Sequence, residues 1–168
     1  MDRWTDDPGG GFRLAGFALA HAAWSVEDGE TLVTLAMVDI DGQRELVRYE
    51  GDIRESIDFA QADLSARLHG GGYAALVYDG YLTPPDGVRT DALFVEVLGA
   101  EGRSIGSVAQ LYRAGRRSRV PLLGRSSGFA LLGVPILSDG VEMPDAERLL
   151  LEGARSHPKA GRYFNGDR

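Results

Sequence analysis

Residues 31–50, TLVTLAMVDIDGQRELVRYE, decide the fold class. Two runs rich in β-branched and apolar residues flank the dipeptide Asp41-Gly42. This dipeptide suits a two-residue type I′ turn, in which both central residues need a positive φ. The stretch therefore predicts an antiparallel β-hairpin, and with it a sheet in which strands that follow each other along the chain pair side by side.

A helix is expected on each side of this hairpin. In residues 12–26, FRLAGFALAHAAWSV, apolar side chains form two stripes, so this helix must be covered on most sides by the fold or by a partner chain. A homodimer through residues 12–26 is therefore one hypothesis. In residues 52–70, Asp52 and Glu55 have the spacing of a helix cap, and Gly70 is expected to end the helix in the left-handed conformation.

The remaining sequence predicts four more strands and one more helix. The strands are expected at 73–82, 90–99, 104–113 and about 129–137, and the helix between Pro144 and Pro158. The order α-β-β-α-β-β-β-β-α with short connections predicts an α+β fold: a mostly antiparallel sheet of five to six strands with two to three helices. Within strand 90–99, apolar residues on both faces indicate that helices cover both sides of the sheet there. The predicted organisation is a flexible N-terminal tail (1–11), a single domain (12–158) and a C-terminal tail (159–168).

Composition excludes several classes of protein. The chain has 168 residues, of which 43% are hydrophobic and 26% charged, as in ordinary globular domains. It contains no cysteine, which excludes disulfides, thiol nucleophiles and cysteine-based metal sites, and we predict neither a metal nor a cofactor. No apolar run approaches the roughly 20 residues of a membrane span, and the acidic, glycine-rich start is unlike a signal peptide, so a cytoplasmic protein is expected. Lys159 is the only lysine among 18 basic residues, a bias typical of high-GC bacterial coding sequences.

The charge is unevenly distributed along the chain. The formal net charge of −7 argues against general nucleic-acid binding. Residues 1–100 carry 18 acidic and 7 basic side chains, whereas residues 101–168 carry 7 acidic and 11 basic ones. Since arginine suits carboxylate and phosphate recognition, we predict a partner-binding patch for an acidic protein or ligand. The alternatives are a solvated loop and intramolecular pairing with the acidic first half. The patch, here called the arginine segment, consists of Arg113, Arg116, Arg117, Arg119 and Arg125.

Two short motifs suggest a different function. The tetrapeptide His69-Gly70-Gly71-Gly72 and the pentapeptide GRSSG at 124–128 resemble the HGGG and G-x-S-x-G signatures of α/β-hydrolase esterases. The resemblance implies a small serine hydrolase with Ser126 as nucleophile and the glycine amides as oxyanion hole. It also implies a triad completed by Asp139 or Asp145 and by His157, in the chain order of that fold.

The sequence around these motifs does not fit a nucleophile elbow. The elbow needs a strand before the serine and a long helix directly after it, above a parallel sheet. Here FALLGVPIL follows, with glycine and proline inside it, and HGGG follows a helix and precedes a strand. Capping glycines and a polar loop are the alternative interpretation, and we give it preference.

A third hypothesis is a small-ligand pocket lined by His21, Trp24 and Glu96. His21 lies on an apolar helical stripe without a second histidine four residues on, so it does not form a metal-binding pair. Glu96 lies mid-strand among apolar residues and should face Ser107 if a turn at Glu101 sets the register. A core histidine and a structural hydrogen bond of Glu96 are the alternatives. The interpretation that we carry forward is a non-catalytic binding or assembly protein that uses the arginine segment.

Overall fold

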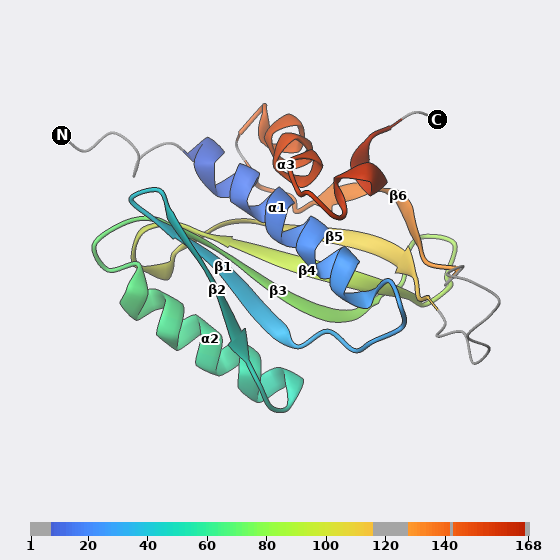
Figure 1. Ribbon diagram of the computed structural model, residues 1–168, viewed down its shortest axis with the longest axis horizontal. Coiled ribbons are helices and arrows are strands. Elements are labelled where there is room, and N and C mark those ends of the chain that lie inside the picture. The colour runs from blue at the N-terminus through green and yellow to red at the C-terminus, as the bar shows by residue number, and fades with distance from the viewer. Residues whose placement is uncertain (1–7, 116–127, 142, 167–168) are drawn as a thin grey trace.

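The computed structural model describes residues 8–115, 128–141 and 143–166 (Figure 1). Within these residues, three α-helices and a six-stranded antiparallel sheet follow the order α-β-β-α-β-β-β-β-α, which confirms the predicted α+β fold. The elements are α1 (Pro8–Val26), β1 (Thr34–Ile40), β2 (Gln43–Tyr49), α2 (Ile53–Arg67), β3 (Tyr73–Leu82), β4 (Thr90–Leu98), β5 (Ser104–Arg113), β6 (Ala130–Leu137) and α3 (Ala146–Arg155), with 3₁₀ turns η1 (Ala100–Gly102) and η2 (Gly161–Phe164).

The sheet has the strand order β2-β1-β3-β4-β5-β6, and every neighbouring pair is antiparallel. The hairpin at its start is the predicted one, because Asp41 and Gly42 have φ values of 52° and 79° and Ile40 pairs with Gln43. The register between β4 and β5 also matches the prediction, with Glu96 opposite Ser107. Local turn chemistry therefore sets the pairing of both hairpins.

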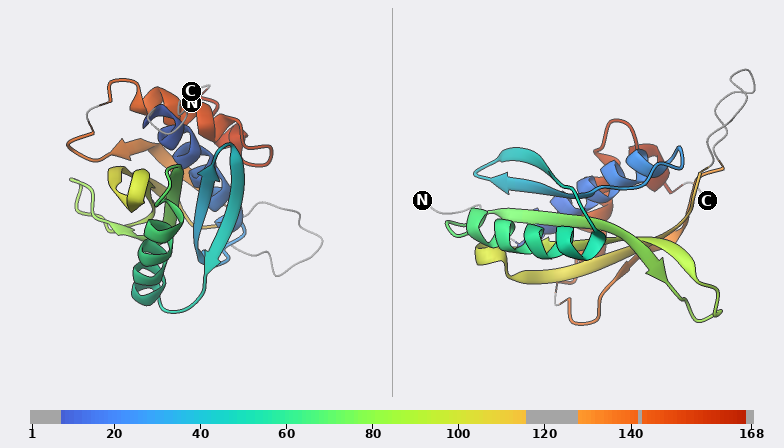
Figure 2. Two further views of the ribbon diagram at one scale, coloured as in Figure 1. Left: turned by 90° about the vertical axis from the view of Figure 1, so that its left-hand side faces the viewer. Right: turned by 90° about the horizontal axis from the view of Figure 1, so that it is seen from below.

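Helices cover both faces of the sheet. Helices α1 and α3 lie on one face and α2 lies on the other (Figures 1 and 2). The larger core, between the sheet and the α1–α3 pair, contains Leu93, Val95 and Val97 of β4, and the smaller core, under α2, contains Leu98 of the same strand. Alternate residues of β4 therefore enter different cores, as expected of a strand with helices on both sides.

The two helices on the first face are in close contact at two glycines. A Cβ atom on Gly16 would lie 1.8 Å from the carbonyl oxygen of Leu150, and one on Gly153 would lie 1.9 Å from that of Arg13. Only glycine fits at either position. The crossing brings the backbones of α1 and α3 together and buries nearly all of the apolar surface of α1 within the chain. The pattern in residues 12–26 that suggested a homodimer is thus accounted for by α3 and the sheet.

Several boundaries differ from those predicted. Helix α1 begins at Pro8, so residues 8–11 belong to a helix and not to a tail. Ala160 and Phe164 are buried, so the C-terminal segment packs on the domain. Helix α2 ends at Arg67, and the left-handed conformation falls on Gly71 and Gly72, not on Gly70. The chain therefore turns into β3 at these two glycines, directly before Tyr73.

Helix α2 covers only part of its face of the sheet. It packs against β1, β2, β3 and η1, and Figure 2 (right) shows it crossing one part of that face. Asp52 caps its first turn by accepting hydrogen bonds from the amides of Arg54 and Glu55, as the sequence predicted. On this side the helix covers the end of β4 near Glu96 and Leu98, whereas the start of β4 and the surfaces of β5 and β6 lie beyond it.

Candidate functional site

An apolar surface lies on the part of the sheet that α2 leaves uncovered. Val108 and Tyr112 of β5 are buried in the core under α1, so the residues between them, Ala109 and Leu111, point to the α2 side. Their partners on β6, Ile136 and Leu132, are 46% and 38% exposed. Together with Phe94 of β4, which pairs with Ala109, these residues form what we call the open face.

An open apolar row is unusual on a sheet that has helices on both sides. Scattered apolar side chains are common on protein surfaces, but a contiguous patch marks an interaction site more often. The members of the open face are contiguous because they are register partners on three adjacent strands. Strand β6 is moreover the last strand of the sheet as described.

The arginine segment connects two strands of the open face. Arg113 is the last residue of β5 and pairs with Ala130 at the start of β6, and its Nε donates to the carbonyl oxygen of Gly128 at 2.9 Å. Arg116, Arg117, Arg119 and Arg125 lie outside the described residues. By sequence they belong to the connection between β5 and β6, so this basic connection begins and ends on strands of the open face.

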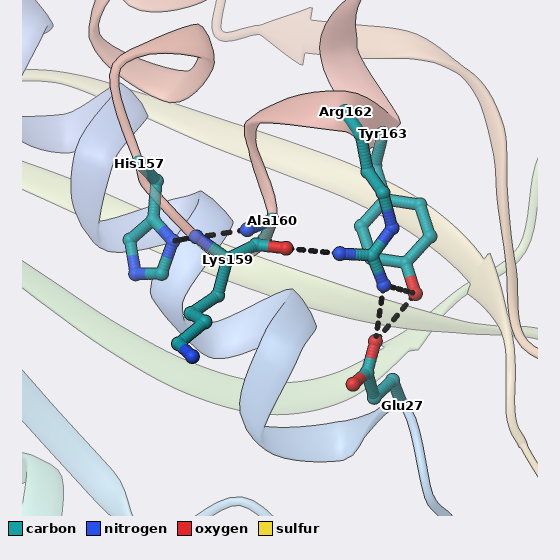
Figure 3. A network of polar contacts seen from close by, with 6 residues as sticks. All are labelled: Glu27, His157, Lys159, Ala160, Arg162 and Tyr163. Carbon is teal, nitrogen blue, oxygen red and sulfur yellow. Dashed lines mark hydrogen bonds and ion pairs between the residues drawn. The ribbon is translucent and has the colours of Figure 1, made fainter.

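A pair of histidines joins α1 to the C-terminal segment. Nδ1 of His21 lies 3.3 Å from Nε2 of His157, and the rings of Phe17 and Trp24 surround the pair. On its other side, Nδ1 of His157 accepts hydrogen bonds from the amides of Lys159 and Ala160 (Figure 3).

These contacts fix the tautomers of both rings. A nitrogen that accepts from two amides carries no proton, so the proton of His157 is on Nε2 and is donated to Nδ1 of His21. The proton of His21 is then on its own Nε2, which is buried and has no hydrogen-bond partner among the described residues. Burial, with the nearby His157 and Arg48, lowers the pKa of His21, and burial also lowers the pKa of His157. Both rings are held neutral by their surroundings.

The same geometry bears on the serine-hydrolase hypothesis. In a triad, Nδ1 of the histidine donates to a carboxylate and Nε2 accepts the serine proton. In His157, Nδ1 accepts from the backbone and Nε2 faces His21, so both nitrogens are engaged in other roles. Asp139 lies in the turn after β6, and Ser126 lies outside the described residues.

The glycine motif and the serine motif also differ from their hydrolase counterparts. HGGG connects α2 to β3, and the amide of Gly71 is already donated to the carbonyl oxygen of Leu68 at 3.0 Å. GRSSG is followed by strand β6, antiparallel to β5, and not by a helix. The placement of HGGG agrees with its interpretation as a connection between a helix and a strand, whereas residues 124–127 of GRSSG lie outside the described residues.

The proposed three-residue pocket is only partly assembled. His21 and Trp24 lie together on α1, with ring centroids 5.6 Å apart. Glu96 is on the opposite face of the sheet, where its carboxylate accepts a hydrogen bond from Nε2 of Gln61 on α2 at 3.2 Å. The three side chains therefore do not line one pocket, and Glu96 has a structural partner.

Sequence reasoning missed the network that holds the C-terminal segment. Glu27, just after α1, accepts from the hydroxyl of Tyr163 and from Nη2 of Arg162 (Figure 3). Arg162 also donates to the carbonyl oxygen of Lys159. Tyr163 and Phe164 are the only available sequence signal, because two aromatic residues near a chain end often pack back on the domain.

Comparisons with known proteins add no family to this picture: no family model, curated protein or solved structure matches the chain. Among the described residues, no three metal-ligating side chains gather into a group. No helix in the described part of the chain has the length and apolar character needed to cross a membrane.

Proposed function

We propose that this protein is a non-catalytic binding protein that docks an acidic protein partner on the open face. The observation that carries the proposal is the row of apolar side chains on β5 and β6, of which Leu132 and Ile136 on β6 are exposed. Apolar contacts on this row would supply affinity, as in other protein interfaces.

The acidic character of the partner follows from the arginine segment. Arg113 ends β5, and by sequence the other four arginines fall in the connection between β5 and β6. Complementary charge at the rim of an interface speeds association and selects partners, and its effect weakens as salt is added. A partner segment with both acidic and apolar residues fits this combination.

A random peptide library displayed on phage tests the proposal with the full chain as bait. We expect the selected peptides to be enriched in Asp, Glu and apolar residues. Ile136→Ser should weaken their binding about tenfold, as expected for an apolar residue at the centre of an interface. Replacing Arg116, Arg117 and Arg119 by Ser should weaken binding at low salt and reduce its dependence on salt.

Val88→Ser is the matched control, because Val88 is 62% exposed but lies in the β3–β4 connection, outside the open face. Selected peptides without acidic residues, or binding that neither set of variants changes, would contradict the proposal. Analytical sedimentation of the same variants tests whether the open face instead binds a second copy of the chain. Self-association that Ile136→Ser abolishes would replace the acidic partner by a second copy of the chain.

A further inference from the structure

A cavity of about 530 Å³ lies between β6, α3 and the C-terminal turn η2. The C-terminal turn and β6 lie side by side next to α3 in Figure 1. The volume of the cavity is in the range of small-molecule sites. The cavity is on the α1–α3 side of the sheet and is separate from the open face. Its apolar walls come from Phe129, Leu131, Val134, Pro135, Leu151 and Phe164.

The backbone of the sheet makes room for this cavity. The register between β5 and β6 shifts between Ala109 and Leu111, so three residues of β6 lie opposite Gln110 alone. Gly133, inside this bulge, has a φ of 74°, which favours glycine. Bulges that bend an edge strand in this way are frequent next to functional sites.

Gln110 forms the inner end of the cavity and has one unsatisfied atom. Its Nε2 donates to the carbonyl oxygens of Leu111 and Gly133, at 2.9 and 3.2 Å. Its Oε1 is buried and has no hydrogen-bond partner among the described residues, and the side chain is 0% exposed. A buried acceptor that neither protein nor solvent satisfies is rare in folded proteins.

Arg155 provides a cation on the wall of the same cavity. Its Nε donates to the carbonyl oxygen of Phe164 at 2.8 Å, which fixes the guanidinium in place. Within the described ranges, no carboxylate pairs with Arg155. Arg162, the other arginine of the cavity, is already paired with Glu27. The cavity therefore presents one available guanidinium, which suits the single charge and planar shape of a carboxylate.

From these features we infer that the cavity binds a small amphiphilic carboxylate. Its apolar body occupies the space between Leu131, Val134 and Phe164. Its carboxylate pairs with the free edge of Arg155. An O–H or N–H group of the ligand donates to Oε1 of Gln110. To reach this atom, the ligand moves aside the side chains at the inner end of the cavity. This site is independent of the partner surface on the other side of the sheet.

Titration calorimetry with matched probes tests the inference on the full chain. We expect 3-phenyllactate and N-acetylphenylalanine to bind, because each has an aromatic body, a carboxylate and a donor. N-acetylphenylalanine amide lacks the carboxylate and 3-phenylpropionate lacks the donor, so each should bind at least tenfold more weakly than its parent. Equal binding of an acid and its amide, or no binding of either acid, would overturn the inference.

Two arginine variants place the binding in the cavity. Arg155→Gln should weaken the acids at least tenfold and leave the amide unchanged. Arg148→Gln, on the same helix but paired with Glu152 outside the cavity, should bind as wild type does. An equal loss of affinity for the acids in both variants would show that they do not bind in this cavity. If Arg155→Gln fails to fold because Phe164 is released, the comparison of acid with amide on the wild type still decides the question.

Discussion

Two neutral histidines in contact make the stability of the protein dependent on pH. Burial lowers the pKa of both His21 and His157 in the folded state, with His157 and Arg48 adding to the effect at His21. Between these lowered values and the ordinary value of 6.5, the unfolded chain binds protons that the folded chain does not. The contribution of the pair to stability is therefore complete above about pH 6.5 and is lost as the pH falls through that range.

His21→Gln should reduce this loss of stability in acid. The amide oxygen of glutamine can still accept the proton of His157 Nε2, while one titrating group is removed. Urea unfolding at about pH 7.5 and about pH 5.5 should show a smaller fall in the free energy of unfolding for the variant than for wild type. His69→Gln removes an exposed histidine at the end of α2 and should leave the fall unchanged. An unchanged fall in His21→Gln would mean that other groups control the acid sensitivity.

Sequence reasoning placed His21 on an apolar side of its helix but did not find its partner. In the structure the side chain is partly buried and its Nδ1 lies against His157. His157, however, is 136 residues away along the chain, and no local pattern connects it to His21. Periodicity describes one element at a time, so it cannot show which residue of another element completes a contact. The same reason explains why Glu96 was grouped with His21, although the two lie on opposite faces of the sheet.

Among the elements, the crossing of α1 and α3 gives the sharpest prediction. Replacing a helical glycine by alanine ordinarily stabilises a helix by up to about 1 kcal/mol. At Gly16 and Gly153 the added methyl group would collide with the backbone of the other helix. Gly16→Ala and Gly153→Ala should each lower the free energy of unfolding by about 2 kcal/mol or more, because the helices must separate.

Thermal or urea unfolding measures this effect, and Gly70→Ala serves as control because a Cβ there meets no atom within 4 Å. The control should unfold within about 0.5 kcal/mol of wild type. Neutral or stabilised Gly16→Ala and Gly153→Ala variants would mean that the two helices do not cross this closely.

The features that depend on neighbouring residues could be predicted from the sequence, and those that depend on distant contacts could not. The Asp41-Gly42 turn, the Asp52 cap and the β4–β5 register depend on neighbouring residues, and all three were predicted. The start of α1 at Pro8 was missed because the glycines after it are poor helix formers, and packing against Tyr73 and Ile105 compensates. The bulge opposite Gln110 had no local signal beyond Gly133, because it depends on how two distant strands align.

For the whole molecule, the open face should contribute little to stability. Leu132→Ser and Ile136→Ser remove exposed side chains, so each should change the free energy of unfolding by no more than about 1 kcal/mol. Leu76→Ala, on β3 beneath α2, removes a fully buried side chain and should cost about 2–5 kcal/mol. Chemical denaturation of the three variants makes the comparison. Severe destabilisation by Ile136→Ser would show that the row belongs to the core.

The sequence could not distinguish a covered face from an open one. Alternation within residues 90–99 indicated that both faces are covered, and this holds at Leu98, which is buried under α2. Coverage is less complete at Phe94, which lies nearer the start of the strand and is partly exposed. An apolar residue in a strand predicts burial, but only the length and direction of the covering helix decide where burial ends.

The glycine crossing has a consequence for how the chain is made. Arg13 on α1 and Glu152 on α3 are paired although 139 residues separate them, so the ribosome releases one helix long before the other. During that interval the apolar surface of α1 that packs on α3 has no permanent cover and is open to aggregation or to a holding chaperone. Synthesis of α3 is then the step that completes the domain, and nascent chains halted before residue 146 should be far more sensitive to protease than full-length ones.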